Sequence, residues 1–132
     1  MNIIIKTVDE SEQRYDTAGD WQVQGNDLYI TVSKQESWKE EVLIGVHELI
    51  EAILCKNRGI TDEEVTEFDK HFKKEGEPGD APDAPYRKEH HFATIVEMLL
   101  CKELEMDWGI YNNGLIKNVQ EGVPVILKQN GM

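Results

Sequence analysis

Hydrophobic and polar positions in the first third of the chain follow a strand pattern. A β-branched run over residues 2–8 predicts one strand. Two more apolar runs, over 21–23 and 28–33, flank the turn-forming sequence Gln-Gly-Asn-Asp and predict a hairpin. In the second run the apolar residues alternate, so that strand has one buried face and one wetter face. We therefore expect a small antiparallel sheet within a β-rich segment, residues 1–36.

After this segment the apolar positions change to helical spacing. Ser37 precedes Glu40 by three residues and Thr61 precedes Glu64 in the same way, so two capping boxes mark helix starts. Gly59 is the expected stop of the first helix. The pattern predicts helices over 38–57, 61–73 and 86–105, and a short helix or turn over 107–118.

A stretch rich in proline, glycine and acidic residues separates the second and third predicted helices. Three of the four prolines in the chain lie within residues 74–85, and proline excludes regular structure there. This loop is either a flexible connection between helices or a lid over a site. Residues 119–132 are expected to form a tail or an edge strand, with 123–128 as the strand. The predicted architecture is one α+β domain, in which the sheet packs on a buried first helix with two further helices around it.

The first predicted helix is apolar on nearly every side, yet it carries His47, Glu48 and Glu51. Such a helix is expected to be buried, and buried charges are usually paired or bound to a metal. His47 and Glu51 lie one turn apart on the same face and can converge on one ion. Glu48 points about 100° away from His47 and can instead reach a water on that ion as a general base. A core histidine paired with Glu51 is the alternative.

The third predicted helix supplies the candidates for a further metal ligand. His90 lies on a stripe of short side chains beside the apolar face, whereas His91 lies close to Lys102. We therefore prefer His90 to His91 as the ligand. Glu97 is about 10 Å further along the helix axis, so we expect it to support a ligand or face the substrate. Arg87 could bind a carboxylate group, or it could form an ion pair with a nearby acidic residue.

Composition limits the partners and the cellular location that are expected for this protein. The formal net charge of −12, from 26 acidic and 14 basic residues, argues against electrostatic capture of nucleic acid. We find no apolar run near the roughly 20 residues that cross a membrane, and we predict no signal peptide. Cys55 and Cys101 form no disulfide framework, so we expect two reduced packing residues in a cytoplasmic protein.

Residues 47–51, His-Glu-Leu-Ile-Glu, resemble the active-site helix of zinc metallopeptidases of the H-E-x-x-H type, the zincins, with Glu51 in place of the second histidine. The thermolysin-like branch of that family uses two histidines and one glutamate as ligands. His47, Glu51 and His90 would supply the same set.

The whole chain also resembles small uncharacterised phage and prophage proteins. That resemblance runs through the stretches GDW, HELIEAILCKNRG, EPGD and APYRKEHHFAT. It implies the host cytoplasm as the location.

These observations lead to three functional hypotheses. The first is a zinc-dependent, peptidase-like hydrolase with Glu48 as general base, in which strand 28–33 binds a peptide or protein substrate by edge pairing. The second is a magnesium-dependent enzyme similar to nucleotide pyrophosphohydrolases, which uses Glu48, Glu51 and Glu97. The third is a phage accessory or interaction protein with a structural metal site and no enzymatic activity.

Overall fold

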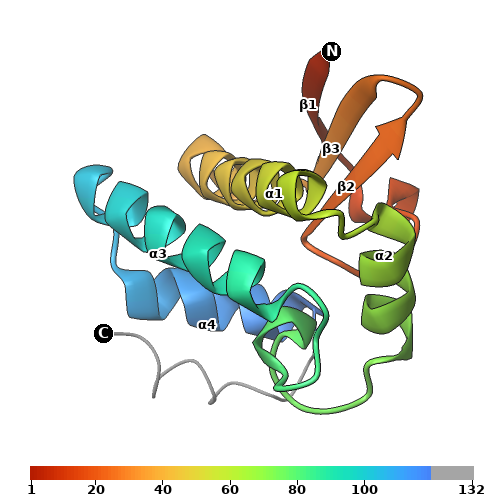
Figure 1. Ribbon diagram of the computed structural model, residues 1–132. Coiled ribbons are helices and arrows are strands. Elements are labelled where there is room, and N and C mark those ends of the chain that lie inside the picture. The colour runs from red at the N-terminus through yellow and green to blue at the C-terminus, as the bar shows by residue number, and fades with distance from the viewer. Residues whose placement is uncertain (120–132) are drawn as a thin grey trace.

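Three strands and four α-helices form the part of the chain that the computed structural model describes, residues 1–119 with side chains through Leu115. The strands are β1 (Ile3–Val8), β2 (Gly19–Gln24) and β3 (Asp27–Ser33). The helices are α1 (Trp38–Arg58), α2 (Asp62–His71), α3 (Arg87–Glu103) and α4 (Trp108–Val119), with short 3-10 helices η1 (Glu10–Glu12) and η2 (Pro78–Asp80). α1 lies between the sheet and α3, and α4 lies against α3 (Figure 1). The predicted α+β class is confirmed.

The sheet is mixed, so the prediction of a wholly antiparallel sheet is wrong. Its strand order is β1-β3-β2, in which β3 pairs in parallel with β1 and antiparallel with β2. The predicted hairpin of β2 and β3 is present, with Gly25 in its turn at φ 61°. Residues 9–18 carry the chain past the end of β3, and the Gln13 side chain bonds Thr31 and Ser33 there. This connection leaves a gap one strand wide between β1 and β2, which β3 fills.

The central strand β3 is buried on one face as its alternating pattern predicts. Leu28, Ile30 and Val32 are at most 3% exposed and form part of the core. β3 has a paired neighbour on both sides, so it offers no free edge to a peptide. The expected edge pairing of a substrate with residues 28–33 is therefore wrong.

Helix α1 begins and ends as its sequence predicts. The Ser37 side chain accepts a hydrogen bond from the Glu40 amide, and Gly59 adopts a left-handed conformation at the other end. α1 contacts β2 and β3 on one side and α3 on another. Cys55 on α1 and Cys101 on α3 are unpaired and fully buried in the core, as expected of packing residues.

The later part of the chain is more helical than predicted. Residues 108–119 form a full helix, α4, so within residues 1–119 three helices rather than two accompany α1. The loop 74–85 contains the 3-10 turn Pro78–Asp80, because proline is accepted at the first position of such a turn, so the prediction of no regular structure there is wrong. The strand predicted over 123–128 lies outside the described residues.

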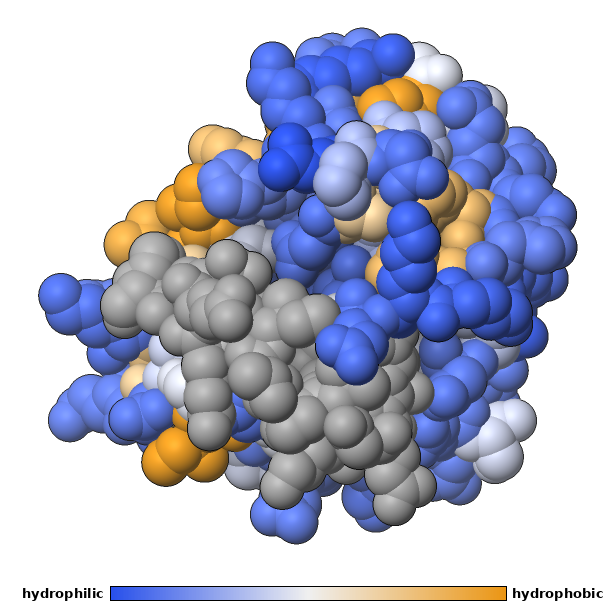
Figure 2. Space-filling model, turned by 90° about the horizontal axis from the view of Figure 1, so that it is seen from below, coloured by the Kyte–Doolittle hydropathy of each residue, from blue (hydrophilic) through white to orange (hydrophobic). Residues whose placement is uncertain are grey.

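The surface is mainly hydrophilic on the face drawn in Figure 2, with a few separate apolar patches. Ile110 and Leu99 are among the large apolar side chains that are exposed. None of the helices within residues 1–119 has the length and apolar character of a membrane span.

Candidate metal centre

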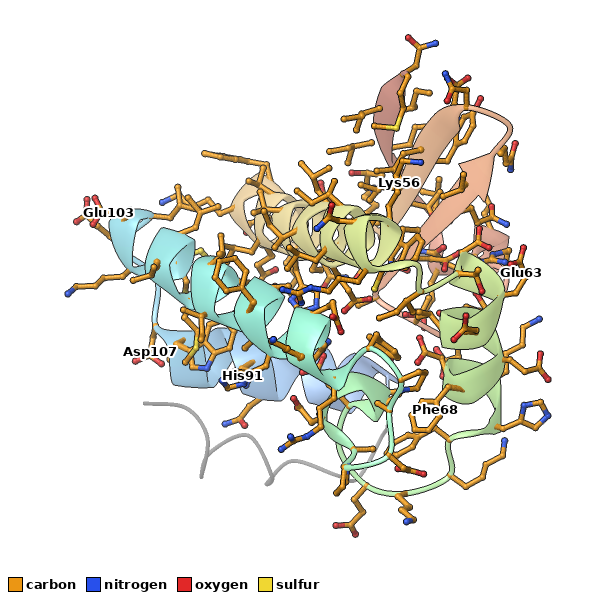
Figure 3. All side chains as sticks on the ribbon, in the orientation of Figure 1. Lys56, Glu63, Phe68, His91, Glu103 and Asp107 are labelled. Atoms are coloured by element: carbon orange, nitrogen blue, oxygen red, sulfur yellow. The ribbon has the colours of Figure 1, made fainter. Side chains whose placement is uncertain are left out.

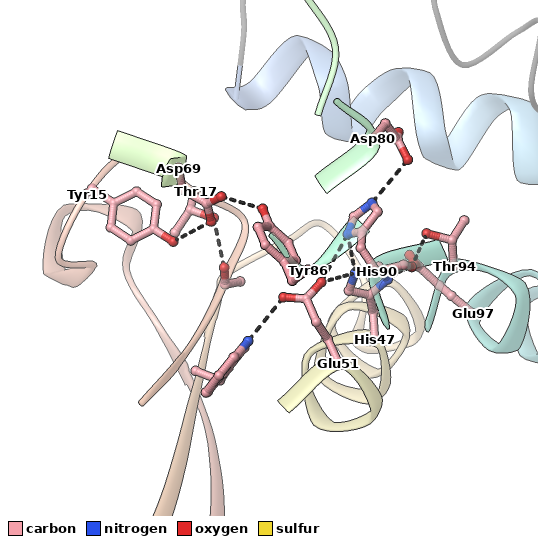
Figure 4. A network of polar contacts seen from close by, with 12 residues as sticks. Tyr15, Thr17, His47, Glu51, Asp69, Asp80, Tyr86, His90, Thr94 and Glu97 are labelled. Atoms are coloured by element: carbon pink, nitrogen blue, oxygen red, sulfur yellow. Dashed lines mark hydrogen bonds and ion pairs between the residues drawn. The ribbon is translucent and has the colours of Figure 1, made fainter. Parts of the chain in front are cut away.

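Three side chains that the sequence nominates as ligands converge where α1 meets α3. His47 and Glu51 project from consecutive turns of α1, and His90 projects from the first turn of α3 (Figure 4). His47 Nε2 lies 3.3 Å from Glu51 Oε2 and 3.2 Å from His90 Nδ1, and the last two atoms are 3.0 Å apart. All three side chains are buried, with 4–7% of each residue exposed. These residues could hold a metal ion.

Hydrogen bonds alone do not satisfy this triangle of atoms. Each of its three edges is short enough for a hydrogen bond, and each needs its own proton. The two ring nitrogens can supply at most two protons, and the ionised carboxylate supplies none. A cation at the centre would accept a lone pair from each of the three atoms, so the arrangement suits metal coordination.

His47 is held from behind by a carboxylate on α3. Its Nδ1 lies 2.8 Å from Glu97 Oε1, and the Tyr111 hydroxyl donates a 2.6 Å hydrogen bond to Glu97 Oε2. When Nδ1 donates its proton to Glu97, the lone pair of Nε2 faces the centre. Glu97 therefore contacts a candidate ligand, His47, from behind, which is one of the two roles that its spacing predicted. Tyr111 lies on α4, whose formation and docking the sequence left open.

Glu51 is held by a residue that the sequence did not single out. Trp21 on β2 donates from its indole Nε1 to Glu51 Oε1 at 3.0 Å. This bond uses the outer oxygen of Glu51 and leaves Oε2 facing the two histidines. The sequence pattern predicts that a tryptophan in this hairpin is a core residue. Its second role, the hydrogen bond to Glu51, follows only from the packing of the sheet on α1.

His90 is bordered by the proline and glycine loop. Its Nε2 lies 3.4 Å from Asp80 Oδ1 at the end of η2. Gly79 lies directly against the ring, because a Cβ atom there would be 2.3 Å from His90 Cγ. Residues 77–80 therefore cover one side of the centre, which favours the lid interpretation of this loop.

The centre opens into a cavity of about 310 Å³, and Glu48 forms part of its wall. Glu48 is partly exposed and lies against Gly19, where a Cβ atom would come within 2.7 Å of Glu48 Cγ. Burial and the charge of Glu51 raise the pKa of Glu48 well above its usual range. The cavity thus contains the three candidate ligands together with a carboxyl group that can exchange a proton.

Another carboxylate on the cavity wall is bound by two tyrosines. Asp69 on α2 accepts hydrogen bonds from the hydroxyls of Tyr15, at 3.0 Å, and Tyr86. Burial raises the pKa of Asp69 to about 7 despite these bonds. Tyr86 packs near His90 with ring centroids 6.0 Å apart, so this group closes the cavity on the side of α2.

The electrostatics of the centre favour positive charge. Burial opposes the charged form of both histidines, but the Glu97 and Glu51 carboxylates raise the pKa of His47 well above its usual range. The carboxylates of Asp80 and Glu51 likewise raise the pKa of His90 to about 10. Burial opposes ionisation of Glu51 too, yet the two histidines lower its pKa to about 2. The carboxylates around the centre therefore favour a bound cation there, either a proton or a metal ion.

Two of the alternative residues lie elsewhere. His91 is exposed and projects from α3 on the side away from α1 (Figure 3). Arg87 is also exposed, and both residues line a different cavity between α3, α4 and the loop. The structure therefore brings His90, and not His91 or Arg87, to the side chains of His47 and Glu51.

Comparisons with known proteins assign no family to the chain. The zincin and phage-protein resemblances remain predictions from sequence motifs. No model of a protein family, no curated protein and no solved structure matches the chain.

Proposed function

We propose that this protein is a zinc-dependent hydrolase. One observation carries the proposal: three candidate ligands converge at the end of a cavity whose wall contains the carboxyl group of Glu48. A structural zinc usually has four protein ligands, whereas a catalytic zinc has three and an open position. The described residues at this centre offer three ligands and a cavity beside them.

The donor atoms support zinc over magnesium. Two imidazoles and one carboxylate are typical zinc ligands, whereas magnesium prefers oxygen atoms alone. Three tetrahedral ligands at zinc distances are about 3.3 Å apart, and the three edges here measure 3.0–3.3 Å. The magnesium hypothesis needs Glu48, Glu51 and Glu97 together, and these three form no candidate metal group among the described residues.

In this proposal the residues of the chain have separate roles. His47, Glu51 and His90 would hold zinc, which would act as a Lewis acid and lower the pKa of water towards 7. Glu48 accepts a proton from the attacking water and later gives it to the leaving group. The positive charge of zinc at this centre would favour the ionised, proton-accepting form of the Glu48 carboxyl group.

We propose a peptide or a similar small amide as the substrate class. The cavity of about 310 Å³ lies at the lower end of the range for ligand sites, so it suits one or two side chains rather than a long segment. A peptide cannot pair with β3, and Asp62 binds the Val23 amide on the outer edge of β2. In this proposal, side chains around the cavity hold the substrate.

Glu48→Gln tests the proposed reaction directly. This change keeps the shape of the side chain and removes the base, so turnover of a peptide library should fall by about 10²–10⁴-fold. Zinc content should match that of the wild type, because Glu48 is not one of the converging ligands. Glu67→Gln, an exposed change on α2, is the matched control for the loss of one carboxylate. A wild-type protein that holds zinc but cleaves no member of the library would contradict the hydrolase proposal.

A further inference from the structure

The two buried histidines of the centre differ in what their outer nitrogens contact. His47 Nδ1 makes a 2.8 Å hydrogen bond with Glu97, which is a normal distance for a charge-assisted bond. His90 Nε2 is buried and has no hydrogen-bond partner among the described residues, although Asp80 Oδ1 lies 3.4 Å away. Leaving a buried polar atom unpaired is destabilising, so native proteins rarely keep one without a reason.

The surroundings of His90 Nε2 supply a second set of metal-binding atoms. Glu77, Asp80 and His90 each place a ligand atom within 4.8 Å of the others. Asp80 lies on the side of the imidazole opposite to Glu51 (Figure 4). Close approach of the loop makes this possible, since Gly79 has no side chain and its backbone packs on the ring.

We propose that Glu77, Asp80 and His90 form a second divalent-cation site, and that the imidazole of His90 bridges this site to the first centre. His90 Nδ1 faces His47 and Glu51, Nε2 faces Asp80, and Glu77 places a ligand atom in the same group. When the second cation binds, the Nε2–H bond breaks and the proton leaves to solvent. The electron pair of that bond then forms the bond to the cation, so the bridging ring is an imidazolate.

Distance and access distinguish this interpretation from simple support of His90 by Asp80. A separation of 3.4 Å is long for a charged hydrogen bond, but it is close to the roughly 3.3 Å between neighbouring ligands of a tetrahedral zinc. The Asp80 side chain is 33% exposed, so a cation and its remaining water ligands can reach the loop. Imidazole nitrogen and carboxylate oxygen are both zinc ligands, so Zn²⁺ is a suitable probe for this site.

Counting bound ions tests this proposal without any assay of activity. The full chain, stripped with a chelator and titrated with Zn²⁺ alone, should bind two ions per chain by native mass spectrometry. Asp80→Asn and Glu77→Gln should each reduce the count to one. His47→Ala should also leave one ion, at the loop site. Asp83→Asn, an exposed change in the same loop, should keep both ions.

A wild-type protein that binds one ion would overturn the second site. If Asp80→Asn then lowered the affinity for that one ion by about tenfold or more, Asp80 would only orient His90. Two ions that persist in both loop variants would also overturn it. The proposal rests on the first centre but not on hydrolysis, because a protein with two ions and no turnover supports it and contradicts only the proposed function.

Discussion

Glu51 has three partners, which between them engage both oxygens of its carboxylate. Trp21 holds Oε1, while His47 and His90 both lie within 3.3 Å of Oε2. His47 is fixed in a similar way, because Glu97 binds its outer nitrogen. A ligand whose outer atom is held in this way loses less conformational freedom when it binds a metal. Support of this kind should therefore be measurable as metal affinity.

Glu97→Gln should weaken zinc binding about tenfold to a hundredfold. The amide keeps the shape of the side chain but loses the negative charge that stabilises the His47 ring in its proposed binding orientation. Competition with a chromogenic chelator measures this affinity.

Glu89→Gln is the matched control for Glu97→Gln. Glu89 is a buried carboxylate on the same helix, but its partner is Arg58 rather than a histidine. This variant should lower stability and leave zinc affinity unchanged. Equal zinc affinity in Glu97→Gln and wild type would show that Glu97 does not support the metal ligand.

At the scale of elements, two glycines permit close contacts with two different parts of the site. A side chain at Gly79 would collide with the His90 ring, including Nδ1 at 2.4 Å. A side chain at Gly19 would collide with Glu48 and Ile44, both at 2.7 Å. The loop and strand β2 thus approach the site from two sides, and each approach depends on the absence of a Cβ atom.

Gly79→Ala should displace His90 and lower both stability and zinc affinity. Overpacking a buried region lowers the free energy of unfolding by about 1–3 kcal/mol. The atoms nearest to the new methyl group include Nδ1 of His90, the proposed ligand atom. Thermal melting with and without zinc measures the two effects. Gly114→Ala is the control, because its Cβ atom meets nothing within 4 Å, so it should be neutral or slightly stabilising. A Gly79→Ala protein with normal zinc affinity would show that the loop does not press on the ring.

Gly19→Ala should distinguish the role of Glu48 as a base from the role of the three metal ligands. The methyl group pushes on Glu48 and not on His47, Glu51 or His90, so zinc affinity should persist. If the proposed hydrolase activity exists, turnover should fall by about a hundredfold, because small misplacements of reacting groups have effects of that size. Parallel measurement of zinc content and turnover tests this, and a variant that loses zinc would place Gly19 next to a ligand instead.

Local patterns predicted the elements and part of the centre, whereas tertiary contacts determined the rest. The Ser37 N-cap and the Thr61 capping box depend on residues three apart, so their helix starts follow from sequence, although the Glu40 side chain does not complete the box predicted at Ser37. The i, i+4 spacing of His47 and Glu51 is equally local. Trp21 and Asp80 reach the centre only because β2 and η2 pack against α1 and α3, respectively.

The pairing of β1 shows the same limit for the sheet. A hairpin is visible in sequence because its two strands and its turn are adjacent. The parallel pairing of β1 with β3 joins residues 25 positions apart, such as Ile5 and Ile30, and no local pattern specifies that choice. Both antiparallel and mixed sheets satisfy the same alternation of apolar residues.

At the scale of the whole molecule, the centre connects every layer of the fold. Its ligands come from α1 and α3, and the residues that hold them come from β2, α3, α4 and η2. A metal ion that binds only this folded arrangement stabilises the entire domain, by an amount that grows with metal concentration. Stability and metal binding should therefore change together with pH.

Zinc should stabilise the protein more at pH 8.5 than at pH 6.5. Without metal, the pKa of His90 is raised from an ordinary value near 6.5 to about 10, so the protonated ring contributes stability below pH 6.5. That contribution decreases as the pH rises towards 10. Zinc must displace this proton, and each displaced proton changes zinc affinity by about tenfold per pH unit within this window. Melting temperatures with excess zinc and with chelator, measured across the window, give the difference.

His90→Ala is the control that assigns this pH dependence to the centre, because it removes both a ligand and a titrating ring. The zinc-induced rise in melting temperature should be small in this variant and nearly independent of pH. His91→Ala removes an exposed histidine one residue away and should behave like the wild type. Wild-type stabilisation by zinc that stays constant from pH 6.5 to 8.5 would mean that no proton leaves on binding. That result would contradict coordination of zinc by a His90 ring that is protonated in the metal-free protein.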